Sequence, residues 1–303
     1  MTATAAEPRA FLLVTHTGRE PATAAARLAA ARLVASGIEV RVPSSEAADL
    51  DLSDVRIVKA GPGAAAGCEL VVVLGGDGTL LRGAEFARGT EAALLGVNLG
   101  HVGFLAEADE DDLAAVVDRL VARAYVVEER LTLDVVVLRD GVQLASSWAV
   151  NEASVEKTSR ERMIEVIVEV DGRPLSRWGG DGVVCATPTG STAYAFSAGG
   201  PVVWPEVQAL LLVPISAHAL FARPLVVAPS SVLAVELVPG TSDGVVWCDG
   251  RRTVDLAPGD RVEVRRGGEP LRLARLSYAP FTDRLVRKFD LSVEGWRGRA
   301  GRA

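Results

Sequence analysis

The feature that most constrains the fold is a change in the period of the apolar pattern near residue 125. From Phe11 to about Ala124, short continuous apolar runs alternate with helical patterns, and such runs are typical of strands covered on both faces. After about Tyr125 the apolar residues follow a period of two instead. The sequence therefore predicts an α/β, Rossmann-like N-terminal domain followed by a mostly antiparallel, all-β C-terminal domain.

The N-terminal half alternates strands with helices. Pro21 stands early in its first helical pattern and Gly37 lies just past the end, as helix boundaries favour. This alternation is the signature of a parallel, doubly wound sheet. The predicted strands are 11–16, 38–42, 69–74 and 93–98, and the predicted helices are 21–36 and 109–125.

The second half is rich in predicted hairpins. Residues 131–150 are typical of two strands about a turn, and 163–175 alternate with a period of two. Residues 281–290 form a short amphipathic pattern. The predicted organisation is an α/β domain over 1–125, a β-rich domain over 126–278, and a tail over 279–303 that packs back on the first domain.

Composition limits the class of protein. The length of 303 residues suits about two domains, and a net charge of −7 argues against binding to a nucleic-acid backbone. The three cysteines have no spacing typical of a zinc site, and no apolar run is long enough to span a membrane. We expect a cytoplasmic protein with no nucleic-acid or membrane partner.

The stretch VVVLGGDGTLLR (71–82) places one carboxylate among three glycines after a predicted buried strand. The carboxyl end of a parallel strand is where α/β proteins bind ligands, and glycines let backbone N–H groups approach phosphate oxygens. The turn therefore predicts a phosphate-binding loop formed by Gly75, Gly76 and Gly78. In it, Asp77 can accept a proton from an attacking hydroxyl or bind the metal ion that accompanies a nucleotide. The alternative is a tight turn in which Asp77 caps a helix that begins near Thr79.

Two further stretches suit nucleotide binding. NEASVEK (151–157) places an amide and a carboxylate at the end of a predicted strand, where they can hold ribose hydroxyls and a base edge. An ordinary turn that begins at this motif, with its acidic side chain in solvent, explains the pattern equally well. DGVVCATPTGSTAYAFSAGGP (181–201) follows a strand with small hydroxyl residues, glycines and an aromatic ring, which is elaborate for a simple connection.

Together these motifs resemble bacterial NAD kinase of the actinobacterial, ATP- or polyphosphate-dependent type, over about Phe11 to Phe289. GGDGT alone is shared with phosphofructokinases and lipid kinases, whereas the other motifs favour NAD kinase over these families. The motifs that carry it, in order, are GGDGTLLR (75–82), GVNLGHVGFLAE (96–107), NEASVEK (151–157), GDGVVCATPTGSTAYAFSAGGP (180–201) and APFTDRLVRKF (279–289).

The resemblance implies transfer of the ATP γ-phosphoryl group to the 2′-hydroxyl of the adenosine ribose of NAD, with the β-rich domain over 126–278 as the NAD-binding domain. It also implies Mg²⁺ or another divalent cation with ATP, and assembly into homodimers or homotetramers. Asp77 is implied as the proton acceptor, and no residue is assigned to a resident metal. The residues implied to bind NAD or ATP are Gly75, Gly76, Gly78, Arg82, Asn151, Glu152, Arg162, Asp181, Thr192, Ala193, Tyr194, Ala195, Phe196 and Ser197.

Two positions depart from the family pattern. Gly179 stands where many members have an arginine, and a small residue there accompanies tolerance of NADH. Arg251 replaces a common glutamine. Two alternatives remain: a lipid or sugar kinase that shares GGDGT, and a dinucleotide sensor without turnover.

Overall fold

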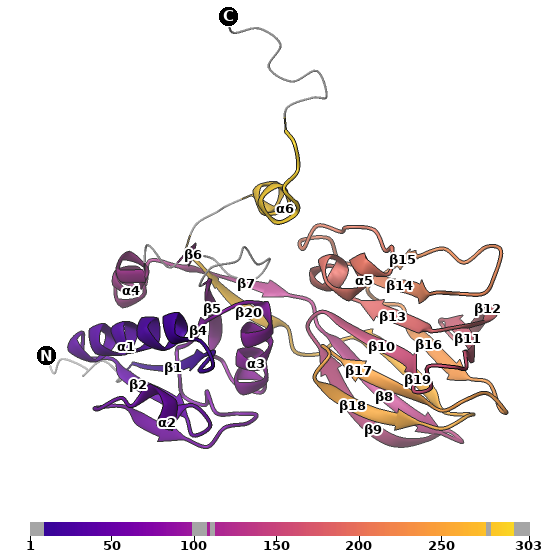
Figure 1. The fold of residues 1–303 in the computed structure, drawn as a ribbon, viewed down its shortest axis with the longest axis horizontal. Coiled ribbons are helices and arrows are strands. Elements are labelled where there is room, and N and C mark those ends of the chain that lie inside the picture. The colour runs from indigo at the N-terminus through magenta and orange to yellow at the C-terminus, as the bar shows by residue number, and fades with distance from the viewer. Residues whose placement is uncertain (1–8, 99–107, 110–112, 277–279, 294–303) are drawn as a thin grey trace, which may run out of the picture. The chain divides into compact units, whose positions relative to one another are not determined.

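The structure, a computed structural model, describes residues 9–98, 108–109, 113–276 and 280–293 (Figure 1). Residues 1–129 and 272–303 belong to one compact unit, and residues 130–271 belong to a second. The chain therefore passes from the first unit to the second at Glu129, close to the change of period near residue 125.

The predicted tail 279–303 lies outside the described residues at 279 and 294–303, and three further predicted features lie partly outside them. They are the motif 96–107 from residue 99 on, the predicted helix 109–125 at residues 110–112, and the motif 279–289 at its first residue.

The first unit is built on one eight-stranded sheet. Its strands follow the order β3-β2-β1-β4-β5-β20-β7, with β6 paired to β5, and β1 to β6 and β20 pair in parallel where their registers are defined. The elements are β1 (Ala10–Thr15), α1 (Glu20–Ala35), β2 (Glu39–Pro43), α2 (Ala47–Leu50), β3 (Arg56–Val58), β4 (Leu70–Leu74), α3 (Asp77–Ala87), β5 (Ala93–Asn98), β6 (Ala108–Asp109), α4 (Leu113–Val121), β7 (Val126–Arg130), β20 (Leu271–Arg275) and α6 (Phe281–Phe289).

Both faces of this sheet are covered, as the continuous apolar runs predict. Alternate residues of β4, among them Val72, join one core cluster with side chains of α1 and α4. The intervening residues Val71 and Val73 lie against Gly83 of α3, on the other face. The prediction of an α/β, Rossmann-like domain is therefore confirmed.

One strand differs from the prediction. Residues 271–275 have a strand pattern that the sequence groups with the β-rich half, but β20 pairs in parallel with β5 of the first sheet, Leu273 opposite Leu94. A strand pattern defines the conformation of a segment and not its partner, so the return of the chain to the first sheet could not be predicted.

The second unit is a pair of six-stranded antiparallel sheets around one apolar core. The predicted hairpins form, because Asp140–Gly141 and Asp171–Gly172 have the positive φ values that tight hairpin turns require. The sheets follow the orders β15-β14-β13-β10-β17-β18 and β12-β11-β16-β19-β8-β9.

The elements of the second unit also include two short helices after β13. The strands are β8 (Leu133–Arg139), β9 (Val142–Ala149), β10 (Glu152–Lys157), β11 (Ile164–Val170), β12 (Arg173–Gly180), β13 (Gly182–Ala186), β14 (Leu210–Ile215), β15 (Leu225–Val227), β16 (Leu233–Leu237), β17 (Gly244–Cys248), β18 (Arg252–Leu256) and β19 (Arg261–Arg266). The helices are a 3₁₀ helix, η2 (Thr189–Thr192), and α5 (Tyr194–Ser197). The predicted antiparallel β domain is confirmed.

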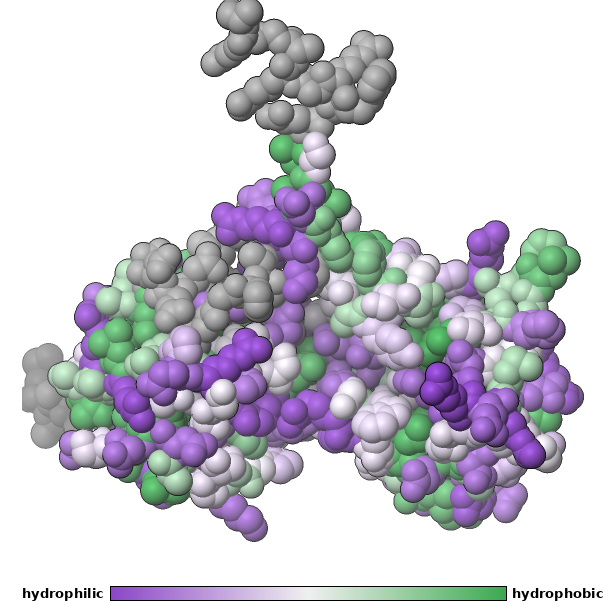
Figure 2. All heavy atoms as spheres, viewed as in Figure 1, coloured by the Kyte–Doolittle hydropathy of each residue, from purple (hydrophilic) through white to green (hydrophobic). Residues whose placement is uncertain are grey.

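The amphipathic pattern of the tail forms a helix, α6, and none of the residues of this helix is buried. Its packing on the first unit therefore stays a prediction. Hydrophilic and hydrophobic residues are interspersed on the visible face of each unit (Figure 2). Within the described part of the chain, no helix has the length and apolar character needed to cross a membrane.

Candidate functional site

The three glycines around Asp77 have different structural roles. Gly75 has a φ of +151°, and a Cβ there would lie 2.7 Å from Thr79 Oγ1, so the turn requires glycine. Gly76 and Gly78 have ordinary φ values, and a Cβ on either would meet nothing within 4 Å. The fold therefore needs one of the three glycines, and the other two leave open space beside the backbone.

Asp77 is the first residue of α3, and Gly76 is the N-cap. The alternative that Asp77 caps a helix beginning near Thr79 is therefore wrong, because the helix begins two residues earlier. Asp77 is partly exposed between the exposed glycines Gly76 and Gly78. Its carboxylate stands at the positive end of the helix, where negative charge is stabilised.

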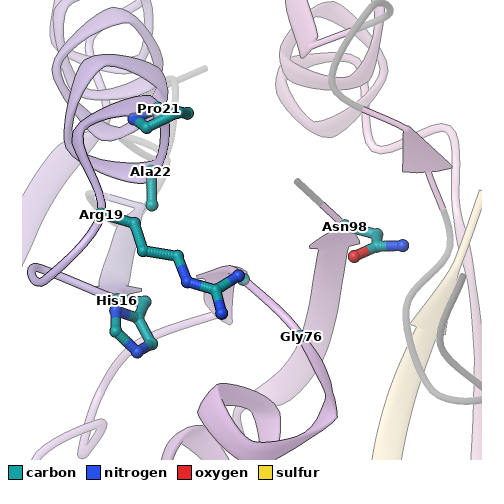
Figure 3. A pocket seen from close by; sticks show the side chains of 7 residues that line it. His16, Arg19, Pro21, Ala22, Gly76 and Asn98 are labelled. Carbon is teal, nitrogen blue, oxygen red and sulfur yellow. The ribbon is translucent and has the colours of Figure 1, made fainter. Parts of the chain in front are cut away.

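A pocket lies beside this turn, at the carboxyl ends of β1, β4 and β5 (Figure 3). The strand order reverses between β1 and β4, and such a switch point is where open α/β sheets bind ligands. In Figure 3 the side chain of Arg19 extends from the start of α1 toward the turn after β4. The lining residues are His16, Arg19, Pro21, Ala22, Gly75, Gly76 and Asn98.

Arg82 is not among the residues that line this pocket. Its Nη2 donates to the backbone oxygen of Thr15 at 2.5 Å and lies 2.8 Å from Glu46 Oε1. The side chain therefore holds the end of β1 in this structure.

In the second unit, Asn151 and Glu152 form a tightly held turn before and at the start of β10. Both residues are 8% exposed. The carboxylate of Asp249 accepts the backbone N–H groups of Val150 and Asn151, the latter at 2.7 Å. Arg252 pairs with Asp249 at 2.9 Å. The turn is therefore fixed by a buried carboxylate from the residue that follows β17.

Burial raises the pKa of Glu152 to about 8, and the nearby carboxylate of Asp249 acts in the same direction. A backbone hydrogen bond from Tyr194 opposes this shift. Among the described residues, Glu152 Oε2 is a buried oxygen without a hydrogen-bond partner. A buried acceptor of this kind is suited to a hydroxyl donor from a ligand.

The other predicted binding residues of this unit lie in three places. The first is the segment after β13: Thr192 ends η2, and Ala193 leads into α5, where Ala195 is buried and Phe196 and Ser197 are exposed. The second is Asp181, whose carboxylate pairs with Lys157 Nζ at 2.5 Å, and this pairing lowers the pKa of Asp181.

The third is Arg162, which is exposed two residues before β11. No hydrogen bond or ion pair described for this unit joins it to Asn151 or Glu152, so its predicted role stays a prediction.

A divalent cation could be held at the turn after β4 together with nucleotide phosphates. Within the described ranges, no group of three or more His, Cys, Asp or Glu side chains could hold a metal. Mg²⁺ is commonly bound by one or two carboxylates together with substrate phosphates and water. Asp77 fits the single-carboxylate role.

The sequence pattern does not mark several residues of these sites as functional. His16 and Arg19 are isolated polar residues after the first strand, and Asp249 is a single acid after a late strand. Only the fold shows that the first two line a pocket and that Asp249 is buried beneath Asn151. The signal available in the sequence is Pro21, which marks the start of a helix just after Arg19.

Two family models match the chain. Residues 11–125 match the ATP-NAD kinase N-terminal domain, and residues 150–276 match the ATP-NAD kinase C-terminal domain. The chain is 65% identical over 292 residues to NAD kinase 2 of Streptomyces avermitilis, covering 96% of this chain and 97% of that protein. It is 60% identical over 301 residues to NAD kinase of Thermobifida fusca, covering 96% and 92%.

Solved structures share the fold. Yeast NADH kinase complexed with NADH matches with a TM-score of 0.85 at 23% identity, covering 95% of this chain and 89% of that chain. An NAD kinase from Archaeoglobus fulgidus in complex with ATP matches with a TM-score of 0.69 at 24% identity, covering 94% and 100%. At these identities the likeness concerns the fold alone.

Proposed function

The chain belongs to the NAD kinase family and is a phosphotransferase, and from this premise we propose how its residues perform the reaction. The γ-phosphoryl group of ATP passes to the 2′-hydroxyl of the adenosine ribose of NAD, and Asp77 accepts the hydroxyl proton. The O–P bond to the leaving ADP breaks as the bond to the 2′-oxygen forms. The products are NADP and ADP.

The observation that carries this proposal is the open space at Gly76 and Gly78, on either side of Asp77. Neither glycine is required by its φ value or by a neighbouring atom. Glycine at such positions lets a ligand approach the backbone closely. Phosphate groups suit this approach, because α3 presents its N-terminal N–H groups there.

The pocket beside the turn supports a site for the donor. Arg19 and His16 line it together with Gly75 and Gly76. A guanidinium can donate two parallel hydrogen bonds to two oxygens of one phosphate. The N-terminal end of the 16-residue helix α1 also favours anions. We assign the phosphates of ATP to this pocket.

The second unit supplies a separate set of residues for the dinucleotide. The buried oxygen Glu152 Oε2 and the neighbouring Asn151 side chain are suited to ribose hydroxyls and a base edge. Asp181, Arg162 and the segment from Thr192 to Ser197 complete the proposed set.

Asp77 needs to be only a weak base. Phosphoryl transfer has a loose transition state, so catalysis depends chiefly on positioning and on charge stabilisation. Mg²⁺, held by the ATP phosphates with Asp77 nearby, would supply neutralisation of phosphate charge. Arg19 contributes positive charge at the pocket.

The proposal also covers the range of acceptors and donors, the location and the assembly of the protein. A Cβ added to Gly179 would have no neighbour closer than 3.7 Å, so packing does not require a small residue there. Because the resemblance links a small residue here to tolerance of NADH, we extend the proposed acceptors to NADH, and, in keeping with the family, the proposed donors to polyphosphate. We also propose a cytoplasmic homodimer or homotetramer, in keeping with the family.

The test is an end-point assay of purified protein with NAD, ATP and Mg²⁺, in which NADP is detected by an NADP-specific dehydrogenase. We expect Asp77→Asn to fold normally and to lower turnover by about 10²–10⁴-fold. Asp118→Asn, on the exposed surface of α4, is the matched control and should keep full activity. Near-normal turnover by Asp77→Asn would end the role of Asp77 as proton acceptor.

A dinucleotide sensor is distinguished in the same assay. It would bind NAD in both wild type and Asp77→Asn, and neither would form NADP. A lipid or sugar kinase would consume ATP only when another hydroxyl acceptor replaced NAD.

A further inference from the structure

An ion pair between a buried carboxylate and a partly exposed guanidinium contacts Thr15, the residue before His16 of the pocket. Glu46, at the N-terminal end of α2, has a side chain that is 1% exposed, and its Oε1 lies 2.8 Å from Arg82 Nη2. Arg82 belongs to α3, the helix that begins at Asp77. The pair therefore connects the β2–α2 segment with the helix that carries the proposed proton acceptor.

Thr15, the last residue of β1, joins both members of this pair. Its backbone N–H donates to Glu46 Oε2 at 2.7 Å, and its backbone oxygen accepts from Arg82. Its hydroxyl lies 3.2 Å from the carbonyl oxygens of Ala22 and Leu74. The next residue along the chain is His16, which lines the pocket.

The cluster thus contacts the elements that surround the pocket near the turn. Ala22 lies in α1 and lines the pocket, Leu74 ends β4, and Gly75 follows it. A shift of Thr15 would therefore move His16, and a shift of Arg82 would move the start of α3.

The ion pair is poorly suited to a purely stabilising role. Burial raises the pKa of Glu46, although the Thr15 N–H and the charge of Arg82 oppose this shift. In the described part of the chain, Arg82 Nε is buried without a hydrogen-bond partner, and Glu46 Oε1 has only its 2.8 Å ion pair with Arg82 Nη2. Removing the Glu46 charge from water costs free energy that a single ion pair recovers only with good geometry, and the Arg82 side chain is still 28% exposed, so the pair is weak evidence for stability.

We propose that Glu46 and Arg82 are positioning residues, which hold His16 and the Gly76–Asp77 turn in the geometry that the phosphoryl donor requires. This proposal rests on the proposed function of the pocket. It assigns Arg82 to the support of the site rather than to direct contact with the ligand. Misplacement of a reacting group by about 1 Å can lower a rate by about 10²-fold, so a small movement here has a large effect.

Glu46→Gln is the decisive variant. Glutamine keeps an oxygen for the Thr15 N–H but removes the negative charge opposite Arg82. We expect kcat/KM for ATP to fall by about tenfold or more, with the Kd for NAD unchanged within about twofold. Arg82→Lys, which keeps the charge but loses the planar fork, should lower kcat/KM in the same way.

Asp260→Asn is the matched control. Asp260 is 0% exposed and pairs with Arg139 at 2.7 Å in the second unit, so it tests the loss of another buried carboxylate. It should lower Tm without changing kcat/KM for ATP once the assay temperature is well below Tm.

The outcomes separate the roles that the pair could have. If Arg82 contacts the donor directly, Arg82→Lys lowers kcat/KM and Glu46→Gln does not, which overturns the proposal. If the pair is only structural, both variants lower Tm and keep kcat/KM within about twofold, which also overturns it. If Glu46→Gln fails to fold, Arg82→Lys is measured instead. A lower Tm with kcat/KM for ATP within about twofold of wild type then indicates a purely structural pair, and a fall of about tenfold supports the proposal.

Wild-type activity in the same assay tests the proposed function itself. If wild type forms no NADP, that function fails, and the positioning role is then measured by titrating wild type and Glu46→Gln with a nonhydrolysable ATP analogue. Equal affinity in that titration would overturn the positioning role on its own.

Discussion

A Cβ atom added to Gly190 would lie 2.0 Å from the backbone oxygen of Asn151. The same segment is tied to this turn by Thr187, whose hydroxyl donates to the Val150 oxygen at 2.7 Å and accepts the Gly190 N–H at 3.0 Å. The loop after β13 therefore lies directly on the backbone of the Asn151–Glu152 turn. Only glycine permits this approach.

Gly190→Ala should displace the Asn151–Glu152 turn. Overpacking of a close contact costs about 1–3 kcal/mol, and we expect a loss of stability of that order together with weaker binding of NAD. Thermal unfolding and a titration with NAD measure the two effects. Gly268→Ala is the control, because its nearest contact would be an ordinary 3.9 Å. Equal NAD affinity in the two variants would contradict the expected displacement.

Gly78→Ala should separate stability from ligand binding. A Cβ on Gly78 meets nothing within 4 Å, and alanine favours a helix over glycine by about 0.5–1 kcal/mol, so the stability should be unchanged or slightly higher. We expect the KM for ATP to rise, because the new methyl group occupies the space that we assign to phosphates. Steady-state kinetics with varied ATP measure it.

Gly83→Ala is the matched control on the same helix. Its Cβ would lie 2.7 Å from Val73 Cγ2, so this variant should lose stability through packing. An unchanged KM for ATP in Gly78→Ala would show that the open space beside Asp77 does not serve the donor.

The elements could be predicted where local pattern determines them. The continuous run in β4 and the Asp–Gly turns at 140–141 and 171–172 indicate strand and hairpin directly, because burial on two faces and positive φ values restrict the residue types. The glycine-rich turn after β4 is recognised in the same way.

The supports of the sites could not be predicted. Glu46 and Asp249 are single acids in the sequence, and their burial arises from contacts between segments far apart in the chain. The partner of β20 is likewise set by tertiary packing. Arg82 shows the limit of a motif: its position follows the glycine-rich turn, but its side chain is directed to Glu46.

The raised pKa of Glu152 makes a pH-dependent prediction. Its pKa is about 8 in the folded chain against an ordinary value of 4.5, because burial and the charge of Asp249 disfavour the ionised form. Between these two values the folded state keeps a proton that the unfolded state has released. The contribution of Glu152 to the free energy of unfolding is therefore full below pH 4.5 and falls as the pH rises toward about 8.

Glu152→Gln should remove this dependence, because glutamine does not titrate. We expect the free energy of unfolding of wild type, relative to Glu152→Gln, to fall as the pH rises from 4.5 to about 8, measured by urea unfolding at several pH values.

Glu69→Gln is the contrasting control: burial raises the pKa of Glu69, but hydrogen bonds from Arg9, Arg123 and Tyr125 outweigh it and lower the pKa to about 2. The contribution of Glu69 is present above pH 4.5 and is lost as the pH falls toward about 2. A difference between wild type and Glu152→Gln that stays constant from pH 4.5 to about 8 would show that Glu152 is ionised in the folded protein throughout this range.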